Sequence, residues 1–134
     1  MGYKSVDGSH IRLLMADAHA LPFADHVFDR VFHVGGIAAF GDPARAIREM
    51  VRVARPGTPI TVVDEAFDND RLSTPYHRWM FKMLTAFDPD VHVPREHLPA
   101  NAEILYDKPL TRFYYCLSFR VPAPPSPVET RRAV

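Results

Sequence analysis

The chain has 134 residues, enough for one domain with a modest core. Its formal net charge is zero and its sequence pI is about 7.1, so it carries no excess of positive charge for a nucleic-acid backbone. Cys116 is the single cysteine, which excludes an internal disulfide or a paired-cysteine metal site and suits a reducing cytoplasm. No apolar run approaches the ~20 residues of a membrane span, and the N-terminal residues lack the apolar segment of a signal peptide.

The first predicted element is a short strand. Residues 1–10 are polar and are expected to form a loop or a frayed end, whereas the apolar run Ile11–Met15 predicts a buried strand. Asp17 follows this strand. Because ligands of open parallel sheets bind at the carboxyl ends of the strands, Asp17 is a candidate binding residue, although a plain loop or cap acid is the alternative interpretation.

The second predicted strand is Val27–Val34. Its nearly continuous apolar character is typical of a strand that is covered on both faces. Gly35 and Gly36 follow directly, and they favour either a plain tight turn or a close approach of the backbone to a ligand.

A helix and a third strand come next. Asp42 is a good N-cap and Pro43 fits the first helical position, while Pro56-Gly57 ends the helix. Its apolar face comprises Ala46, Ile47, Met50, Val51 and Ala54, and Arg45, Arg48, Arg52 and Arg55 lie on the opposite face. The short β-branched run Pro59–Asp64 then predicts a strand. Strand, helix and strand form a βαβ unit, which requires a parallel pair.

The second predicted helix begins at Thr74-Pro75, after an acidic loop over residues 65–72, and ends at residues 88–90. Its aromatic and methionine stripe comprises Tyr76, Trp79, Met80, Met83, Leu84 and Phe87. The stripe indicates either a helix packed on the sheet or a lid over an apolar substrate. The following ten residues allow at most one helical turn.

The remaining segments predict a hairpin and a tail. Glu103–Tyr106 and Phe113–Val121 read as antiparallel strands joined by a turn over residues 107–111. Residues 122–134 contain four prolines and no apolar period, so we expect a disordered tail after a domain that spans residues 1–121.

Five short motifs follow one another along this chain. They are Asp17-Ala18, Leu21-Pro22-Phe23, Phe28-Asp29-Arg30-Val31, Asp42-Pro43 and Arg52-Val53-Ala54-Arg55-Pro56-Gly57-Thr58. Over about 50 residues this series resembles the second half of class I S-adenosylmethionine-dependent methyltransferases, especially the branch that includes ubiquinone and menaquinone biosynthesis methyltransferases. The resemblance implies an α/β fold, namely a partial Rossmann-like sheet of parallel strands with an antiparallel C-terminal hairpin.

The resemblance also implies a binding site for S-adenosylmethionine. Asp17 would accept a hydrogen bond from the adenine amino group, and the backbone N–H of Ala18 would reach an adenine ring nitrogen. His33, Val34 and Gly35 would lie against the methionine part of the cofactor. The implied reaction is methyl transfer to a small molecule, apolar if the aromatic helix forms a lid.

The sequence identifies no catalytic residue, and none is required, because methyl transfer needs mainly in-line placement of donor and acceptor. His33 is a candidate for orienting an acceptor, whereas Cys116 is expected to be a core residue rather than a nucleophile. No metal site is expected, since His19, His26 and His33 do not share a face.

The sequence departs from the family pattern in three places. It contains no Gly-x-Gly-x-Gly loop and no following acid for the ribose, Thr58 replaces the second glycine of the Pro-Gly-Gly turn, and Ala38-Ala39 stands where many relatives carry His-His. The first departure removes about three or four hydrogen bonds from the cofactor site. At ~1–1.5 kcal/mol each this is roughly 4 kcal/mol, or about a thousandfold in affinity. We therefore expect a weakly active or inactive fragment: a truncated gene, a misplaced start codon or a partial read.

The same departure has a structural consequence. The strand Ile11–Met15 would have no neighbour in the sheet, and Val27–Val34 would form an exposed apolar edge. The alternative function is thus a non-catalytic interaction domain, which dimerises through this edge or pairs with a chain that supplies the Gly-rich half. A cytoplasmic location is expected, without nucleic-acid or membrane partners.

Overall fold

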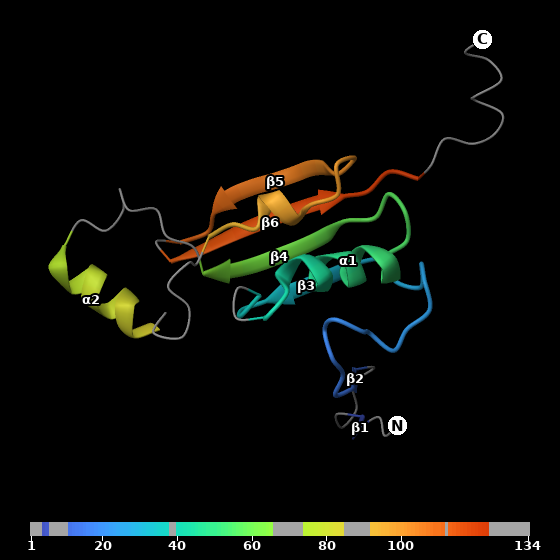
Figure 1. Ribbon diagram of the computed structural model, residues 1–134, viewed down its shortest axis with the longest axis horizontal. Coiled ribbons are helices and arrows are strands. Elements are labelled where there is room, and N and C mark those ends of the chain that lie inside the picture. The colour runs from blue at the N-terminus through green and yellow to red at the C-terminus, as the bar shows by residue number, and fades with distance from the viewer. Residues whose placement is uncertain are drawn as a thin grey trace, which may run out of the picture.

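The computed structural model describes residues 4–5, 11–37, 40–65, 74–84, 92–111 and 113–123. Its main feature is a four-stranded sheet in the order β3-β4-β6-β5, with α1 packed across one face (Figure 1). The strands are β3 (Val31–Val34), β4 (Ile60–Glu65), β5 (Glu103–Pro109) and β6 (Tyr114–Arg120), and the helix α1 is Pro43–Val53.

The predicted βαβ unit is confirmed. Strand β3 pairs parallel with β4, with Val31 opposite Ile60 and Val34 opposite Val63. Helix α1 starts where the sequence predicts, because the Asp42 side chain accepts the Arg45 N–H at 2.8 Å. The helix ends at Val53, and Gly57 then adopts a φ of +79°, which a residue with a Cβ rarely adopts.

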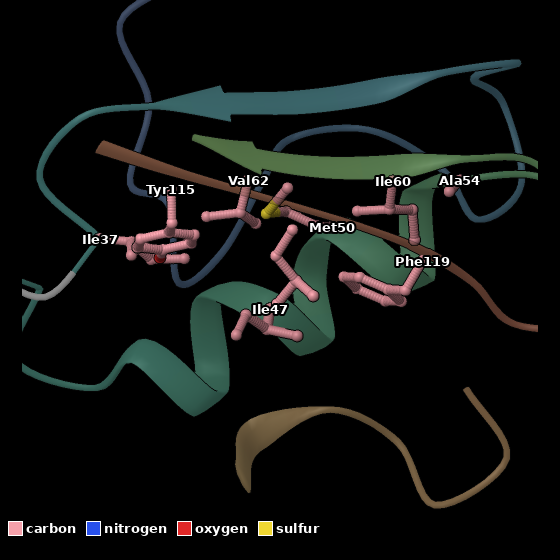
Figure 2. Close-up of a cluster of buried hydrophobic side chains, with 9 residues drawn as sticks. Ile37, Ile47, Met50, Ala54, Ile60, Val62, Tyr115 and Phe119 are labelled. Carbon is pink, nitrogen blue, oxygen red and sulfur yellow. The ribbon is translucent and has the colours of Figure 1, made fainter. Parts of the chain in front are cut away.

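The hydrophobic core lies between α1 and one face of the sheet. Figure 2 shows Ile47 and Met50 of α1 pointing toward Val62 of β4 and Phe119 of β6. The whole buried cluster comprises Ile37, Ile47, Met50, Ala54, Ile60, Val62, Tyr115, Leu117 and Phe119. Each fully buried aliphatic or aromatic side chain contributes about 1.5–3 kcal/mol, so this single layer accounts for much of the stability of the fold.

The opposite face of the sheet is open at β3. Phe32 is 75% exposed and Val34 is 64% exposed, so the prediction that both faces of this strand are covered is wrong. The strand also begins at Val31 rather than Val27, and Phe28 makes only an isolated bridge to Ala54. Because β3 lies at the edge of the sheet, the prediction of an exposed apolar edge is confirmed.

The prediction of a buried strand at Ile11–Met15 is wrong. Only β2 (Arg12–Leu13) forms there, and it pairs antiparallel with β1 (Lys4–Ser5), within a segment that was expected to be a loop. The apolar side chains of Ile11, Leu13 and Met15 are exposed. As expected, the run has no neighbour in the main sheet, and without one an apolar run cannot become a buried strand.

No described side chain of the second helix, α2 (Pro75–Leu84), belongs to the hydrophobic core on the sheet. The helix lies beyond the end of β4 (Figure 1), and its side chains Tyr76, Trp79 and Met83 are exposed. The packing prediction is therefore wrong, whereas the alternative of a lid stays a prediction. Glu65, the first residue of the predicted acidic loop, is the last residue of β4. The rest of that loop, the end of the second helix and nearly all of the predicted tail lie outside the described residues.

The C-terminal hairpin is confirmed. Strands β5 and β6 pair antiparallel, and β6 also pairs antiparallel with β4. Strand β5 runs to Pro109, three residues beyond the prediction, and the Leu110 N–H closes the turn on the Tyr114 carbonyl at 2.8 Å. The single helical turn allowed after α2 is η2 (Arg95–His97).

Candidate functional site

The carboxyl ends of β3 and β4 lie together at one end of the sheet, because the two strands are parallel. Immediately after β3, Gly35 and Gly36 adopt φ values of +76° and +84°. The Gly35 N–H donates to the Val63 carbonyl at 2.9 Å, which continues the ladder one step past β3. The two glycines therefore turn the chain sharply at the edge where ligands of such sheets bind.

A buried carboxylate holds this turn. Asp64 is 1% exposed, and its side chain accepts the N–H groups of Gly36 at 2.8 Å and Ile37 at 2.5 Å. Burial favours a higher pKa for Asp64, but hydrogen bonds from Glu65 and the backbone lower it. The pKa of Glu65 is raised, first by its hydrogen bond with Asp64, so Glu65 takes up a proton before Asp64 does as the pH falls.

Asp17 lies in a loop with one carboxylate oxygen engaged and the other available. Its Oδ1 accepts the backbone N–H of His19 at 2.8 Å and contacts the His19 Nδ1 at 2.9 Å. Its Oδ2 has no hydrogen-bond partner among the described residues, and the side chain is 65% exposed. The hydrogen bonds from the His19 backbone and ring lower the pKa of Asp17, so the carboxylate is ionised at neutral pH. The neighbouring Ala18 N–H also lacks a hydrogen-bond partner within the described part of the chain.

Ring contacts connect the Asp17 loop to the end of β3. The His19 ring meets the Phe40 ring edge-on at 5.9 Å between centroids, and the same Phe40 ring meets His33 at 5.2 Å. Asp17 and His33 thus belong to one continuous set of contacts. The structure brings these two predicted site residues to the same side of the sheet.

The other predicted site residues, His33, Val34 and Gly35, lie next to one another at the carboxyl end of β3. The His33 side chain is half-buried, and burial lowers the pKa of His33, so the ring is neutral near pH 7. Its Nε2 is buried without a hydrogen-bond partner in the described structure. Val34 points to the open face, while Gly35 starts the turn held by Asp64. A neutral imidazole nitrogen without a partner can accept or donate one hydrogen bond to a ligand at this edge.

Three polar residues that hold the loops of this site were not identified as site residues from the sequence. They are Asp64, Glu49 and Arg52. Asp64 is an acid at the end of an apolar strand, the same signal that singled out Asp17. Glu49 and Arg52 have the three-residue spacing of an ion pair on a helix. The sequence places Arg52 on the helix face opposite the apolar one, and the structure shows that its guanidinium donates to the carbonyls of Leu21 and Phe23 in the Asp17 loop.

Two hollows lie elsewhere on the described surface. One of about 430 Å³ is at the opposite, amino-terminal end of the parallel strands, between Ala54, Ile60 and Val121. The other, of about 540 Å³, lies between the Asp17 loop and α1 and includes His19, Arg45 and Arg48. Neither of these two hollows is lined by residues at the end of β3.

The described residues contain no group of three or more histidine, cysteine or carboxylate side chains that could hold a metal ion. None of the described helices is long and apolar enough to cross a bilayer.

Comparison with known proteins gives consistent results. Residues 3–62 match the methyltransferase domain family. The chain is 36% identical over 84 residues to the demethylmenaquinone methyltransferase of Mycolicibacterium vanbaalenii, an alignment that covers 58% of this chain and 37% of that protein. It is 42% identical over 57 residues to the ubiquinone/menaquinone biosynthesis C-methyltransferase UbiE of Hahella chejuensis, covering 42% of this chain and 23% of that protein.

The fold has solved counterparts as well. The geranyl diphosphate C-methyltransferase of Streptomyces coelicolor superposes with a TM-score of 0.61 at 13% identity, over 84% of this chain and 53% of that one. At this identity the likeness establishes the fold alone. The chain spans well under half the length of the curated relatives that it matches. The motif series, the βαβ unit and the sequence matches together support a class I S-adenosylmethionine-dependent methyltransferase domain, and the chain is similar to the ubiquinone and menaquinone branch of that family.

Proposed function

We propose that this chain supplies half of an S-adenosylmethionine site. Asp17 and Ala18 bind the adenine, and His33, Val34 and Gly35 line the methionine part. The observation that carries the proposal is the pairing of a fixed, ionised carboxylate, whose Oδ2 is open, with an adjacent N–H that has no partner in the described structure. An amino donor beside a ring-nitrogen acceptor on adenine is complementary to that pair.

The other half of the site requires groups outside these 134 residues, in the same polypeptide or in a second chain. The sequence has no Gly-x-Gly-x-Gly loop for the amino-acid end of the cofactor and no matching acid for the ribose. Three or four absent hydrogen bonds correspond to roughly 4 kcal/mol, so a micromolar site becomes roughly millimolar.

The proposed reaction is methyl transfer to a small apolar molecule. The cofactor supplies the methyl group from its sulfonium, and the chain contributes placement of the two reactants. His33 orients the acceptor through its Nε2, which has no other partner in the described chain. Because this part of the protein aligns with enzymes named for demethylmenaquinone and ubiquinone biosynthesis, a quinone-like ring is the acceptor class that we propose.

Helix α2 is the proposed lid over that acceptor. Its exposed Tyr76, Trp79 and Met83 form an apolar surface beyond the end of β4 (Figure 1). Its first turn is anchored near the hairpin turn by a contact between the rings of His77 and Phe113, 6.4 Å apart. An aromatic surface at this edge favours a flat, apolar acceptor.

Calorimetric titration with S-adenosylhomocysteine tests the half-site. The isolated chain is expected to bind with a Kd of roughly 1 mM, and addition of the Gly-rich segment of a curated relative is expected to tighten binding by up to about a thousandfold. A Kd tighter than about 100 μM for the isolated chain would contradict the half-site. Unchanged binding with the added segment, at any affinity, would contradict it as well.

A second candidate function is a non-catalytic interaction domain that pairs through β3. It is favoured by the exposed Phe32 and Val34 on an edge strand, where unpaired N–H and C=O groups are available for another strand. Sedimentation velocity distinguishes the two functions. A concentration-dependent dimer that binds no S-adenosylhomocysteine even at millimolar concentration supports the interaction domain and contradicts the half-site.

A further inference from the structure

Arg52 is the centre of a hydrogen-bond network between α1 and the Asp17 loop. Its guanidinium uses all five of its N–H groups. Nε and one Nη2 hydrogen bind the Glu49 carboxylate, both at 2.8 Å, and the other Nη2 hydrogen binds the Leu21 carbonyl at 2.9 Å. The two Nη1 hydrogens bind the Phe23 carbonyl at 2.8 Å and the Asp25 carboxylate at 2.7 Å. The flat fork of arginine suits this arrangement, and the single ammonium of lysine cannot reproduce it.

Glu49 completes the network from the other side. Its Oε2 accepts the Leu21 N–H at 2.8 Å, so both backbone polar groups of Leu21 are held by one ion pair. Strong ion-pair bonds with Arg52 lower the pKa of Glu49 to about 2, and the pair therefore stays ionised at neutral pH. One turn earlier on α1, the Arg45 Nε donates to the His19 carbonyl at 2.9 Å.

These three helix residues are the polar attachment of the loop. Each hydrogen bond that joins residues 14–25 to another described part of the chain ends on Arg45, Glu49 or Arg52. The segment contains no helix or strand beyond its own turns. Its other attachments are the ring contacts of His19 and Phe23 and, directly after it, the backbone hydrogen bonds of His26 and Val27 to α1. A loop without such anchors samples many positions, and ordering it on binding costs affinity.

We propose that Arg52 is a positioning residue for the adenine site. With Glu49 it fixes the loop from Leu21 to Asp25 on α1 and so sets where Asp17 and Ala18 meet the base. This inference rests on the function proposed above. Arg52 itself touches neither the cofactor nor the acceptor, and its effect is expected on recognition of the adenine amino group.

The test compares two nucleosides that differ only in the group Asp17 would bind. Adenosine carries the 6-amino group and purine riboside has hydrogen in its place. NMR titration of the 134-residue chain measures both affinities in the millimolar range. The unaltered chain is expected to favour adenosine by about tenfold, which corresponds to one hydrogen bond to a charged group.

Arg52→Lys is expected to reduce that preference to below about twofold, and Glu49→Gln to reduce it in the same direction. The matched control is Arg48→Lys on the same helix. Arg48 is exposed, and its ion pair with Asp42 is long, at 3.9 Å, so the tenfold preference should remain. Combining Arg52→Lys with Asp17→Asn should give no greater loss of preference than Asp17→Asn alone, because both changes act on one contact.

Three outcomes would overturn the inference. If Arg52→Lys and Glu49→Gln weaken the binding of both nucleosides equally, the network stabilises the fold and does not position Asp17 for the adenine amino group. If neither variant changes the preference while Asp17→Asn abolishes it, Asp17 binds adenine without this network. If Asp17→Asn also leaves the preference unchanged, the proposed adenine site fails together with the inference drawn from it.

Discussion

At the scale of single residues, two acids at the sheet edge have different roles. Asp64 is buried and uses its oxygens to hold the turn after β3, whereas Asp17 is exposed with its Oδ2 open in the described structure. In the sequence the two acids look alike, because each stands at the end of an apolar run. Burial separates the structural acid from the candidate binding acid, and burial depends on which segments pack together, which the sequence of a short loop does not specify.

Gly36 provides a first prediction. Its φ of +84° is unfavourable for a residue with a Cβ, although an added Cβ would meet no atom within 4 Å. Gly36→Ala should therefore lower the free energy of unfolding by about 1 kcal/mol through backbone strain alone. Gly41→Ala is the matched control, since Gly41 has equal space and no positive φ, and it should change the free energy by less than about 0.5 kcal/mol. Equal losses in urea titrations of both variants would refute this explanation.

Glu49 gives a second prediction, on pH dependence. Its pKa is lowered from 4.5 to about 2 in the folded chain, so its stabilisation is present above pH 4.5 and is lost as the pH falls toward 2. After discounting for partial exposure, Glu49→Gln should cost about 1–2 kcal/mol at pH 7 and less at pH 3.5. Urea unfolding at both pH values measures the difference. Glu103→Gln, which breaks an exposed pair with Arg120, should cost under about 1 kcal/mol. A cost for Glu49→Gln that does not fall with pH would contradict the assignment.

At the scale of elements, local signals account for what the sequence predicted well. The Asp42 cap, the Pro43 start and the apolar period of α1 act within one segment, so its limits and its buried face follow from them. The hairpin of β5 and β6 is similarly local. Whether α2 is buried or exposed does not depend on its own sequence alone. Its stripe satisfies the helical period, but whether it meets the sheet depends on segments on either side, and Trp79 is in fact 61% exposed.

A third prediction follows from this contrast between the helices. Trp79→Ser should change the free energy of unfolding by less than about 0.5 kcal/mol, because the side chain leaves little buried area behind. Ile47→Ala in α1 should cost about 2–5 kcal/mol, since Ile47 is fully buried in the core of Figure 2. Thermal or urea unfolding compares the two variants. A loss at Trp79 as large as that at Ile47 would mean that α2 packs against the domain in solution.

At the scale of the whole molecule, the described fold is a sheet with one face covered by α1 and with β3 and β5 as its two edge strands. The sequence predicted the exposed edge, because the parallel sheet of the family places further strands between Asp17's segment and β3. It did not predict the open face, since an apolar strand such as Val31–Val34 reads the same whether its second face is covered by this chain or by another.

The edge gives a fourth prediction. Phe32→Lys places a charge on the open face at the edge strand and should abolish any concentration-dependent self-association seen in sedimentation velocity. The fold should be retained, because Phe32 is 75% exposed. Arg30→Lys, which keeps the charge at an exposed position just before β3, serves as the control and should leave association unchanged. Association that survives Phe32→Lys would show that the contact lies elsewhere.

The central claim is that the Asp17 loop and the end of β3 contact one bound cofactor. Intermolecular nuclear Overhauser effects, measured on the isotope-labelled chain with millimolar S-adenosylhomocysteine, test it most directly. We predict contacts from the adenine protons to the Ala18 methyl group and from the homocysteine methylene protons to the Gly35 α protons at the carboxyl end of β3, in the same complex. Bound ligand that shows contacts to only one of these two residues, or to the hollow beside Val121 instead, would contradict the account.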